Sequence, residues 1–285
     1  MDIVKIDEVH DYLYFMASPG NATRKYLYRS KLDGSSKPER ITPASQPGTH
    51  EYVLSPSATF GYHEFTNTFT PPMAEWITIN DHKGITNADA VDKAIRERKK
   101  GNAPEFFTVK TVDGISIDGW MQKPANFDKT KKYPTLLFCL GGPQGTTPQY
   151  SFRWNFQLMA SQGYIVVAPD RRGVFGNGTK WTEGVSKDWG GQAIRDYLSA
   201  IDAVSKESYV DKQRLGCVGA SYGGFSVFAL EGLHNGRFKT FISHDGVFDF
   251  RSMYGTTDEM WFENWEKGGA YYDKNNTIAQ RSFTQ

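Results

Sequence analysis

The chain has 285 residues, with 33 Lys or Arg and 32 Asp or Glu, so its formal net charge is only +1 at pH 7. This near-zero charge gives no reason to expect nucleic acid or an anionic membrane as a partner, and no apolar run reaches the roughly 18 residues of a membrane span. At about 150 residues per domain, the length predicts one large domain or two smaller ones, and we expect two.

The first 80 residues alternate short strand-like runs with turn residues. Runs at 11–18, 24–32 and 38–42 surround the turn Asp33-Gly34, and three more follow before residue 80. About six strands at spacings of roughly 8 to 12 residues are typical of propellers or sandwiches. They would make about one and a half blades, whereas a closed propeller needs at least about four. We therefore expect residues 1–80 to be the final blades of a partial β-propeller, cut at its amino end.

Residues 81–104 form a charged stretch that we interpret as a linker, within which 88–100 could be a solvated helix. From Glu105 onward the pattern changes. A hairpin is predicted first, followed by continuous apolar runs such as TLLFCL at 135–140 and YIVVAPD at 164–170, separated by helical stretches. Continuous apolar strands alternating with helices predict an α/β domain over residues 105–285, with a mostly parallel, doubly wound sheet.

No metal or cofactor is expected. The six histidines are scattered, and neither an H-E-x-x-H motif nor a paired-cysteine spacing is present. Cys139 and Cys217 each lie in an apolar run, which favours two small core residues over a disulfide.

The motif with the clearest chemistry is Gly219-Ala220-Ser221-Tyr222-Gly223, a G-x-S-x-G between an apolar strand and a helical run. Glycines at these positions allow a sharp turn that lifts the serine hydroxyl above the sheet, beside the helix amino terminus. Ser221 is therefore the predicted nucleophile, with a purely structural turn as the alternative.

A second loop, Gly141-Gly142-Pro143-Gln144-Gly145, follows the strand TLLFCL. In the α/β-hydrolase arrangement this loop supplies one oxyanion donor, and the residue after the nucleophile supplies the other. We thus predict that the backbone amides of Tyr222 and of the Gly141 region form an oxyanion hole, in which one donor is commonly worth about 3 kcal/mol. Taken alone, the loop could equally be an ordinary tight turn.

A third loop, beginning with Asp170, Arg171 and Arg172, would lie on the same edge of the sheet. One arginine could orient a substrate. The alternative is a structural ion pair of Arg171 or Arg172 with Asp170 or Asp188.

The remaining members of a catalytic triad are missing from the pattern. In this fold the order along the chain is serine, acid, histidine, yet only His234 and His244 follow Ser221, and neither lies where the base is expected. The acid and the histidine are therefore predicted to be absent from this chain, and residue 285 to be a break.

The carboxyl two thirds resembles the prolyl oligopeptidase family of serine peptidases, in its branch of bacterial dipeptidyl-peptidase 5 and acylaminoacyl-peptidase-like enzymes. The resemblance rests on KKYPTLLFCLGGPQG, SFRWNFQLMASQGYIVVAPDRRG, YVDKQRLGCVGASYGGFSV and MYGTTDEMWFENWEKGGAYYDK, and YLYFMAS near the amino end is similar to that family's propeller. It implies an incomplete α/β-hydrolase domain preceded by the last propeller strands.

The same resemblance implies an acyl-enzyme on Ser221, short peptides as substrates, and release of amino-terminal dipeptides or acylated residues, although this fragment itself is expected to be inactive. Leu140 departs from the family, whose members often carry a polar residue at that position. The compartment depends on the missing amino end: extracytoplasmic if it carried a signal, otherwise cytoplasmic. The oligomeric state is left open.

Two other functions compete with a peptidase. A small-ester hydrolase would use the same serine turn and oxyanion loop but would not need the propeller-like segment. A non-catalytic relative that keeps the fold without the triad is the second alternative, although stopping within the sheet would leave an apolar edge unpaired.

Overall fold

The computed structural model describes residues 2–20, 24–85, 90–99, 103–146 and 150–281. It divides into two compact units, one comprising residues up to Pro104 together with a short segment ending at Asn155, and the other the rest of the chain. Residues 81–104, which we expected as a linker, are thus grouped with the first unit.

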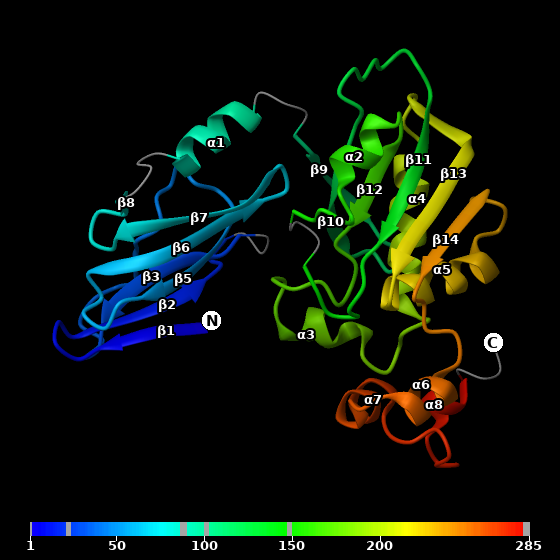
Figure 1. Cartoon of the computed structure of the whole chain (residues 1–285). Helices are drawn as coiled ribbons and strands as arrows, with labels where there is room; N and C mark the ends of the chain where they lie inside the picture. Colours follow the sequence, from blue (N-terminus) through cyan, green and yellow to red (C-terminus); the bar gives the residue numbers. More distant parts are fainter. Residues whose placement is uncertain (1, 21–23, 86–89, 100–102, 147–149, 282–285) are drawn as a thin grey trace. The chain divides into compact units, whose positions relative to one another are not determined.

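The first unit contains two antiparallel sheets of four strands each, in the orders β1-β2-β3-β4 and β5-β6-β7-β8 (Figure 1). Its strands are β1 (Asp2–Asp7), β2 (Tyr12–Ala17), β3 (Tyr26–Lys31), β4 (Glu39–Arg40), β5 (Thr49–Leu54), β6 (Phe60–Asn67), β7 (Thr70–Thr78) and β8 (Lys83–Gly84). Seven of these strands lie within residues 1–80, one more than the expected count of about six, because β1 was not recognised; the two-residue β8 lies beyond residue 80. The described strands make two four-stranded, propeller-like sheets rather than one and a half.

Alternation of side chains explains why these segments form strands with one buried face. Along β6, Gly61, His63, Phe65 and Asn67 are buried, while the residues between them are more exposed, which is the period of two of a half-buried strand. Leu27, Ile77 and Ile79 are fully buried in the apolar core of this unit.

Helix α1 (Ala90–Lys99) packs on β7 rather than standing free in solvent. Val91 and Ile95, four residues apart and therefore on one helix face, are 1% and 6% exposed and pack with Phe65. The solvated helix that we expected therefore has one buried face.

The second unit is built on a six-stranded sheet in the order β14-β13-β11-β12-β10-β9. Strands β9 (Glu105–Lys110) and β10 (Ser116–Gln122) form the predicted hairpin, and β10 is antiparallel to β12. The other four strands are mutually parallel: β11 (Tyr133–Cys139), β12 (Ile165–Pro169), β13 (Val210–Ala220) and β14 (Thr240–His244). The unit thus has the mostly parallel sheet of an α/β-hydrolase.

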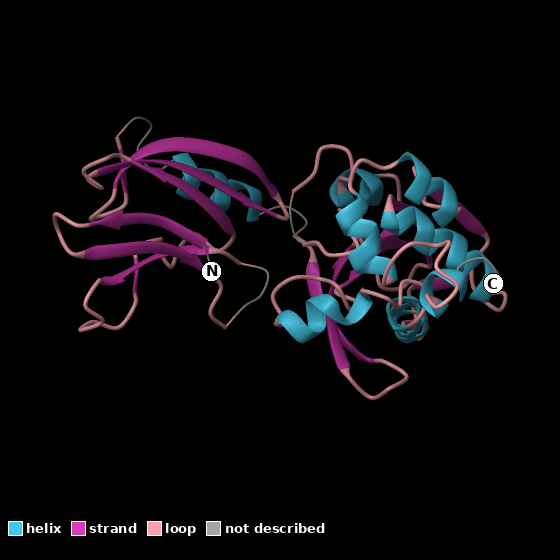
Figure 2. Cartoon of the chain, turned by 90° about the horizontal axis from the view of Figure 1, so that it is seen from below, coloured by secondary structure: helices cyan, strands magenta, loops and turns pink. Residues whose placement is uncertain are grey.

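Helices cover both faces of this sheet, as Figure 2 shows for the second unit. Leu137 and Cys139 of β11 belong to the core shared with α4 (Gln192–Val204) and α5 (Tyr222–Leu233). Phe138, which points to the other face, contacts Phe156 of α2 (Phe156–Ser161), with ring centroids 5.0 Å apart. The remaining helices are α3 (Thr179–Thr182), the 3-10 turn η1 (Glu183–Val185), α6 (Phe250–Thr256), α7 (Met260–Lys267) and α8 (Thr277–Arg281).

Among the helices described, none is long and apolar enough to cross a membrane. Cys139 and Cys217 are both buried and unpaired in the core of the second unit.

Candidate active site

Ser221 lies on the sharp turn between the end of β13 and the start of α5. Its backbone has φ 57° and ψ −122°, a conformation that residues other than glycine seldom adopt. The Ser221 amide donates to the carbonyl oxygen of His244, 3.0 Å away. The Ser221 side chain is exposed, so its hydroxyl is available to a ligand at the carboxyl edge of the sheet.

The flanking glycines are required by close backbone packing. A Cβ on Gly219 would lie 2.7 Å from the carbonyl oxygen of Cys139, and one on Gly223 would overlap the same atom. Both distances are below normal van der Waals contact, so a side chain at either position would push the turn away from β11.

The loop after β11 lies directly beside this turn. A Cβ on Gly141 would lie 3.0 Å from the Ala220 carbonyl oxygen and 3.8 Å from the Ser221 Cβ. Tyr222 is the first residue of α5, where backbone amides have no acceptor within the helix. Two segments 80 residues apart in sequence are thus adjacent.

The side chain of Tyr222 is fully buried and takes no part in the exposed surface. Its hydroxyl donates to the Trp189 carbonyl oxygen at 2.8 Å, and burial raises the pKa of the phenol to about 12. Tyr222 thereby anchors the first turn of α5.

Arg171 holds the loop after β11 in place through hydrogen bonds to its carbonyl oxygens. Its guanidinium, which is 0% exposed, donates to the carbonyl oxygens of Leu140 at 3.0 Å and Pro143 at 2.7 Å, and at 3.4 Å to that of Gly141. It also donates to the Tyr197 hydroxyl at 3.0 Å, which in turn accepts the Leu140 amide at 2.8 Å. The idea that Arg171 could orient a substrate is therefore wrong, because the guanidinium is buried among loop carbonyls.

The neighbouring Arg172 forms the ion pairs instead. It lies 2.6 Å from a carboxylate oxygen of Asp113 and 3.7 Å from one of Asp196. These partners differ from the expected Asp170 or Asp188, because a carboxylate on the β9–β10 turn and another on α4 meet the Arg172 side chain. Sequence spacing gave no sign of either.

Glu266 of α7 accepts hydrogen bonds from two other segments of the chain. Its carboxylate is 1% exposed and accepts hydrogen bonds from Gln144 at 2.9 Å, Ser186 at 2.8 Å and Trp189 at 2.7 Å. Since Gln144 belongs to the loop after β11, this buried carboxylate connects that loop to α7. Nothing in the sequence indicated this role for Glu266.

The two histidines that follow Ser221 are occupied elsewhere. His234 caps the end of α5 and accepts the Phe238 amide at Nδ1, 3.2 Å away. His244 ends β14, and its Nε2 lies 3.0 Å from a carboxylate oxygen of Asp245.

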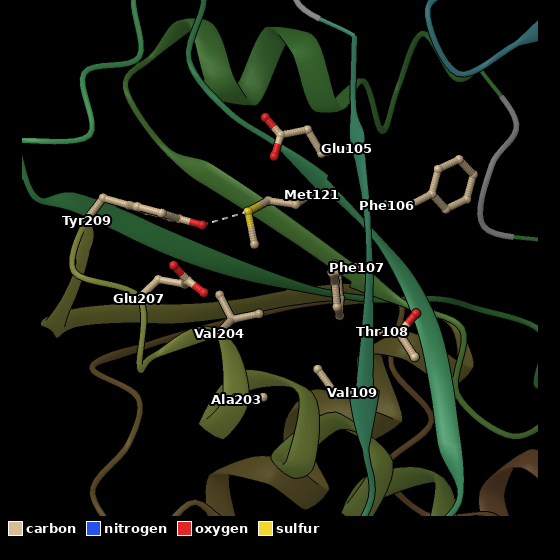
Figure 3. A pocket seen from close by; sticks show the side chains of 10 residues that line it. All are labelled: Glu105, Phe106, Phe107, Thr108, Val109, Met121, Ala203, Val204, Glu207 and Tyr209. Atoms are coloured by element: carbon tan, nitrogen blue, oxygen red, sulfur yellow. Dashed lines mark hydrogen bonds between the residues drawn. The ribbon is translucent and has the colours of Figure 1, made fainter.

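A hollow of about 330 Å³ lies away from this turn, between β9, β10 and the end of α4 (Figure 3). It is lined by residues such as Glu105, Phe107 and Tyr209, whose hydroxyl donates to the Met121 sulfur at 3.8 Å. No residue of the serine turn or the Gly141 loop lines it, so we do not place a substrate there.

Both parts of the chain are similar to known proteins. The model of the prolyl oligopeptidase family matches residues 150–283, and that of the dipeptidyl peptidase IV N-terminal region matches residues 1–72. Dipeptidyl-peptidase 5 of Porphyromonas gingivalis is 52% identical over 207 residues. The chain belongs to the prolyl oligopeptidase family.

The matched region covers much more of this chain than of its relatives. The match to the P. gingivalis enzyme covers 72% of this chain but only 30% of that protein, and dipeptidyl-peptidase 5 of Schizosaccharomyces pombe is 37% identical over 59% of this chain and 25% of its own. The chain thus spans less than a third of the length of these family members.

Two solved structures are also similar to this chain. The crystal structure of P. gingivalis dipeptidyl peptidase 4 has a TM-score of 0.75 and 25% identity, covering 88% of this chain and 35% of its own. Pyrococcus horikoshii acylaminoacyl peptidase has the same TM-score at 23% identity, covering 95% and 41%. The second likeness supports the fold alone.

Proposed function

We propose that this chain supplies the nucleophile and the oxyanion donors of a serine peptidase that acts on short peptides. The observation that carries the proposal is the exposed Ser221 on a turn with positive φ, directly beside the Gly141 loop. The Ser221 Oγ attacks a peptide carbonyl carbon, the amine leaves, and water then hydrolyses the acyl-enzyme.

The oxyanion donors in this proposal are the backbone amides of Tyr222 and of the Gly141 region. Both belong to segments held by buried contacts, Tyr222 through Trp189 and the loop through Arg171. Donors that are fixed before the reaction stabilise a developing oxyanion without reorganisation. Leu140 adds no polar side chain, so the proposed donors are backbone groups.

For the substrate, we infer that the product is an amino-terminal dipeptide. Support comes from the 52% identity to a dipeptidyl-peptidase 5, whereas the acylaminoacyl peptidase is similar in fold only. The two propeller-like sheets support a peptidase rather than a small esterase, because an esterase needs no such domain.

The isolated 285-residue chain is expected to turn over peptides poorly. His234 accepts the Phe238 amide and His244 lies beside Asp245, so we infer that neither is the base for Ser221. Losing the base and acid of a triad costs about 10⁴-fold or more. Supplying an acid and a histidine by grafting the corresponding carboxyl-terminal segment of P. gingivalis dipeptidyl-peptidase 5 should produce activity.

The test uses this grafted protein with dipeptidyl chromogenic substrates and a serine-directed phosphonate. We expect turnover that Ser221→Ala abolishes, and labelling of Ser221 but not of the buried Ser226, which serves as the internal control. A grafted protein that folds and hydrolyses simple esters, yet leaves every dipeptidyl substrate intact, would replace the peptidase with an esterase.

A further inference from the structure

A cluster of buried histidines lies in the first unit, outside the serine site. His63 of β6 is directly opposite both Tyr52 of β5 and Glu75 of β7 in the sheet register. His82, on the turn between β7 and β8, packs edge-on against His63 with ring centroids 4.8 Å apart. The exposed fractions of His63, Glu75 and His82 are 0%, 7% and 9%.

The hydrogen bonds of this cluster imply that a cation lies between His63 and Glu75. The Gln46 carbonyl oxygen can only accept, so the His50 Nε2 that lies 2.9 Å from it carries a hydrogen. His50 is 0% exposed, and burial favours its neutral ring, so its Nδ1 is an acceptor. His63 therefore donates from Nε2 to His50 Nδ1 across 2.8 Å.

This arrangement turns a lone pair of His63 toward Glu75. In the neutral His63 ring, Nδ1 has no hydrogen, yet it lies 2.9 Å from a carboxylate oxygen of Glu75. Two acceptors at that distance repel each other unless a cation lies between them, and the cation is either a proton or a metal ion.

The surroundings of His82 favour a metal ion over a proton as this cation. Its Nδ1 is buried and has no hydrogen-bond partner among the described residues, while its Nε2 is 2.8 Å from the Tyr52 hydroxyl. A proton shared by His63 and Glu75 would leave the His82 Nδ1 unsatisfied, at the usual cost of a buried polar group. A metal ion would use the lone pairs of all three residues.

We propose that His63, Glu75 and His82 bind one divalent transition-metal ion, for which Zn²⁺ is the best match. One ligand atom from each residue lies within 4.8 Å of the others, and imidazole with carboxylate is a donor set that Zn²⁺ accepts. The other nitrogen of each histidine already has a partner, His50 or Tyr52, as is usual for metal-bound imidazole.

The ion would join β6, β7 and the turn that follows β7. Zinc–ligand bonds of about 2.0–2.2 Å require ligand atoms roughly 3.3 Å apart. When the ion binds, the 2.9 Å separation between His63 Nδ1 and the Glu75 carboxylate oxygen would therefore widen slightly, and ligand atoms as far as 4.8 Å apart would move closer. Its contribution is to the stability of the first unit and is independent of the peptidase function proposed above.

The experiment titrates Zn²⁺ into the chelator-treated 285-residue chain, followed by calorimetry and thermal melting. We expect one ion per chain and a higher melting temperature. Glu75→Gln and His82→Ala should weaken binding by at least about 100-fold, and His50→Ala by about 10- to 100-fold through the supporting hydrogen bond. His10→Ala is the matched control, because that exposed histidine should leave the affinity unchanged.

Two further measurements use the unsubstituted chain, so they do not require the variants to fold. Bound Co²⁺ should give a d–d spectrum without a thiolate charge-transfer band, which excludes Cys139 and Cys217 as ligands. Nitrogen NMR of the zinc-loaded chain should show His63 and His82 each with a hydrogen on Nε2 only. Two results would overturn the proposal. One is that the cluster binds Zn²⁺ no more tightly than an exposed histidine such as His10 does, and the other is a His63 ring that carries hydrogen on both nitrogens when Zn²⁺ is present.

Discussion

At Ser221 the backbone holds a non-glycine residue at φ 57°, and such conformations cost about 1–3 kcal/mol. Ser221→Gly and Ser221→Ala should both remove acyl-enzyme formation, but they should differ in stability. The glycine variant relieves the strain while losing about 0.5–1 kcal/mol to chain entropy, so we expect it to be about 1 kcal/mol more stable than the alanine variant.

Denaturant unfolding of the two variants, compared at equal m values, measures this difference. Equal stability, or a more stable alanine variant, would mean that the turn is not strained at this position.

Arg171 is the residue whose removal should most disturb the loop after β11, which we propose as an oxyanion loop. Arg171→Met leaves the carbonyl oxygens of Leu140 and Pro143 buried without their donor, and each hydrogen bond to a charged group is worth about 1.5–3 kcal/mol. We expect a loss of at least about 3 kcal/mol in the free energy of unfolding.

Arg214→Met is the matched control for this change. Arg214 is an exposed arginine paired with Asp211, and exposed pairs contribute about 0–1 kcal/mol. Similar losses for the two substitutions in a urea titration would show that Arg171 is not the anchor of the loop.

At the scale of elements, α1 offers a test of the packing in the first unit. Ile95→Ala removes a side chain that is 6% exposed against Phe65, and such truncations cost about 2–5 kcal/mol. Lys93→Ala, on the exposed side of the same helix, should change stability by less than about 0.5 kcal/mol. The comparison is made by thermal or denaturant unfolding, and equal effects would mean that α1 is solvated, as its charged sequence suggested.

Much of the second unit could be predicted because its strands are continuous apolar runs. β11, β12 and β13 were recognised in this way, and the position of Ser221 followed from the strand, turn and helix around it. The two-residue β8 is too short to give a periodic pattern, and β1 was overlooked although it contains Ile3, Val4 and Ile6.

Side-chain partnerships far apart in sequence were not predictable by the same reasoning. Arg171 bonds to carbonyl oxygens about 30 residues away, and Glu266 to a glutamine 122 residues away. Every residue has a backbone carbonyl, so the sequence does not show which carbonyls accept a hydrogen bond from an arginine. A glutamate in a charged stretch also gives no sign in the sequence that it is buried.

For the whole molecule, we expect the 285-residue chain to self-associate. In the described part of the sheet β14 pairs with β13 alone, and large apolar side chains at Ile242, Phe248 and Trp261 are 48%, 81% and 69% exposed. Exposed strand edges and apolar patches favour association. Sedimentation should show oligomers and a hydrophobic dye should bind, whereas a monomer with one sharp melting transition would contradict the expectation.

The position of Glu266 near the end of the chain determines when its hydrogen bonds can form during synthesis. The Gln144 loop and Ser221 leave the ribosome before α7 does, and until residue 266 has emerged the side chains of Gln144 and Trp189 lack their acceptor. At about 5–20 residues per second, the nascent chain spends several seconds with its serine turn synthesised and the loop after β11 held by Arg171 but not yet by Glu266. This chain would therefore complete the contacts of the loop after β11 late, when all six strands of the second unit have already been synthesised.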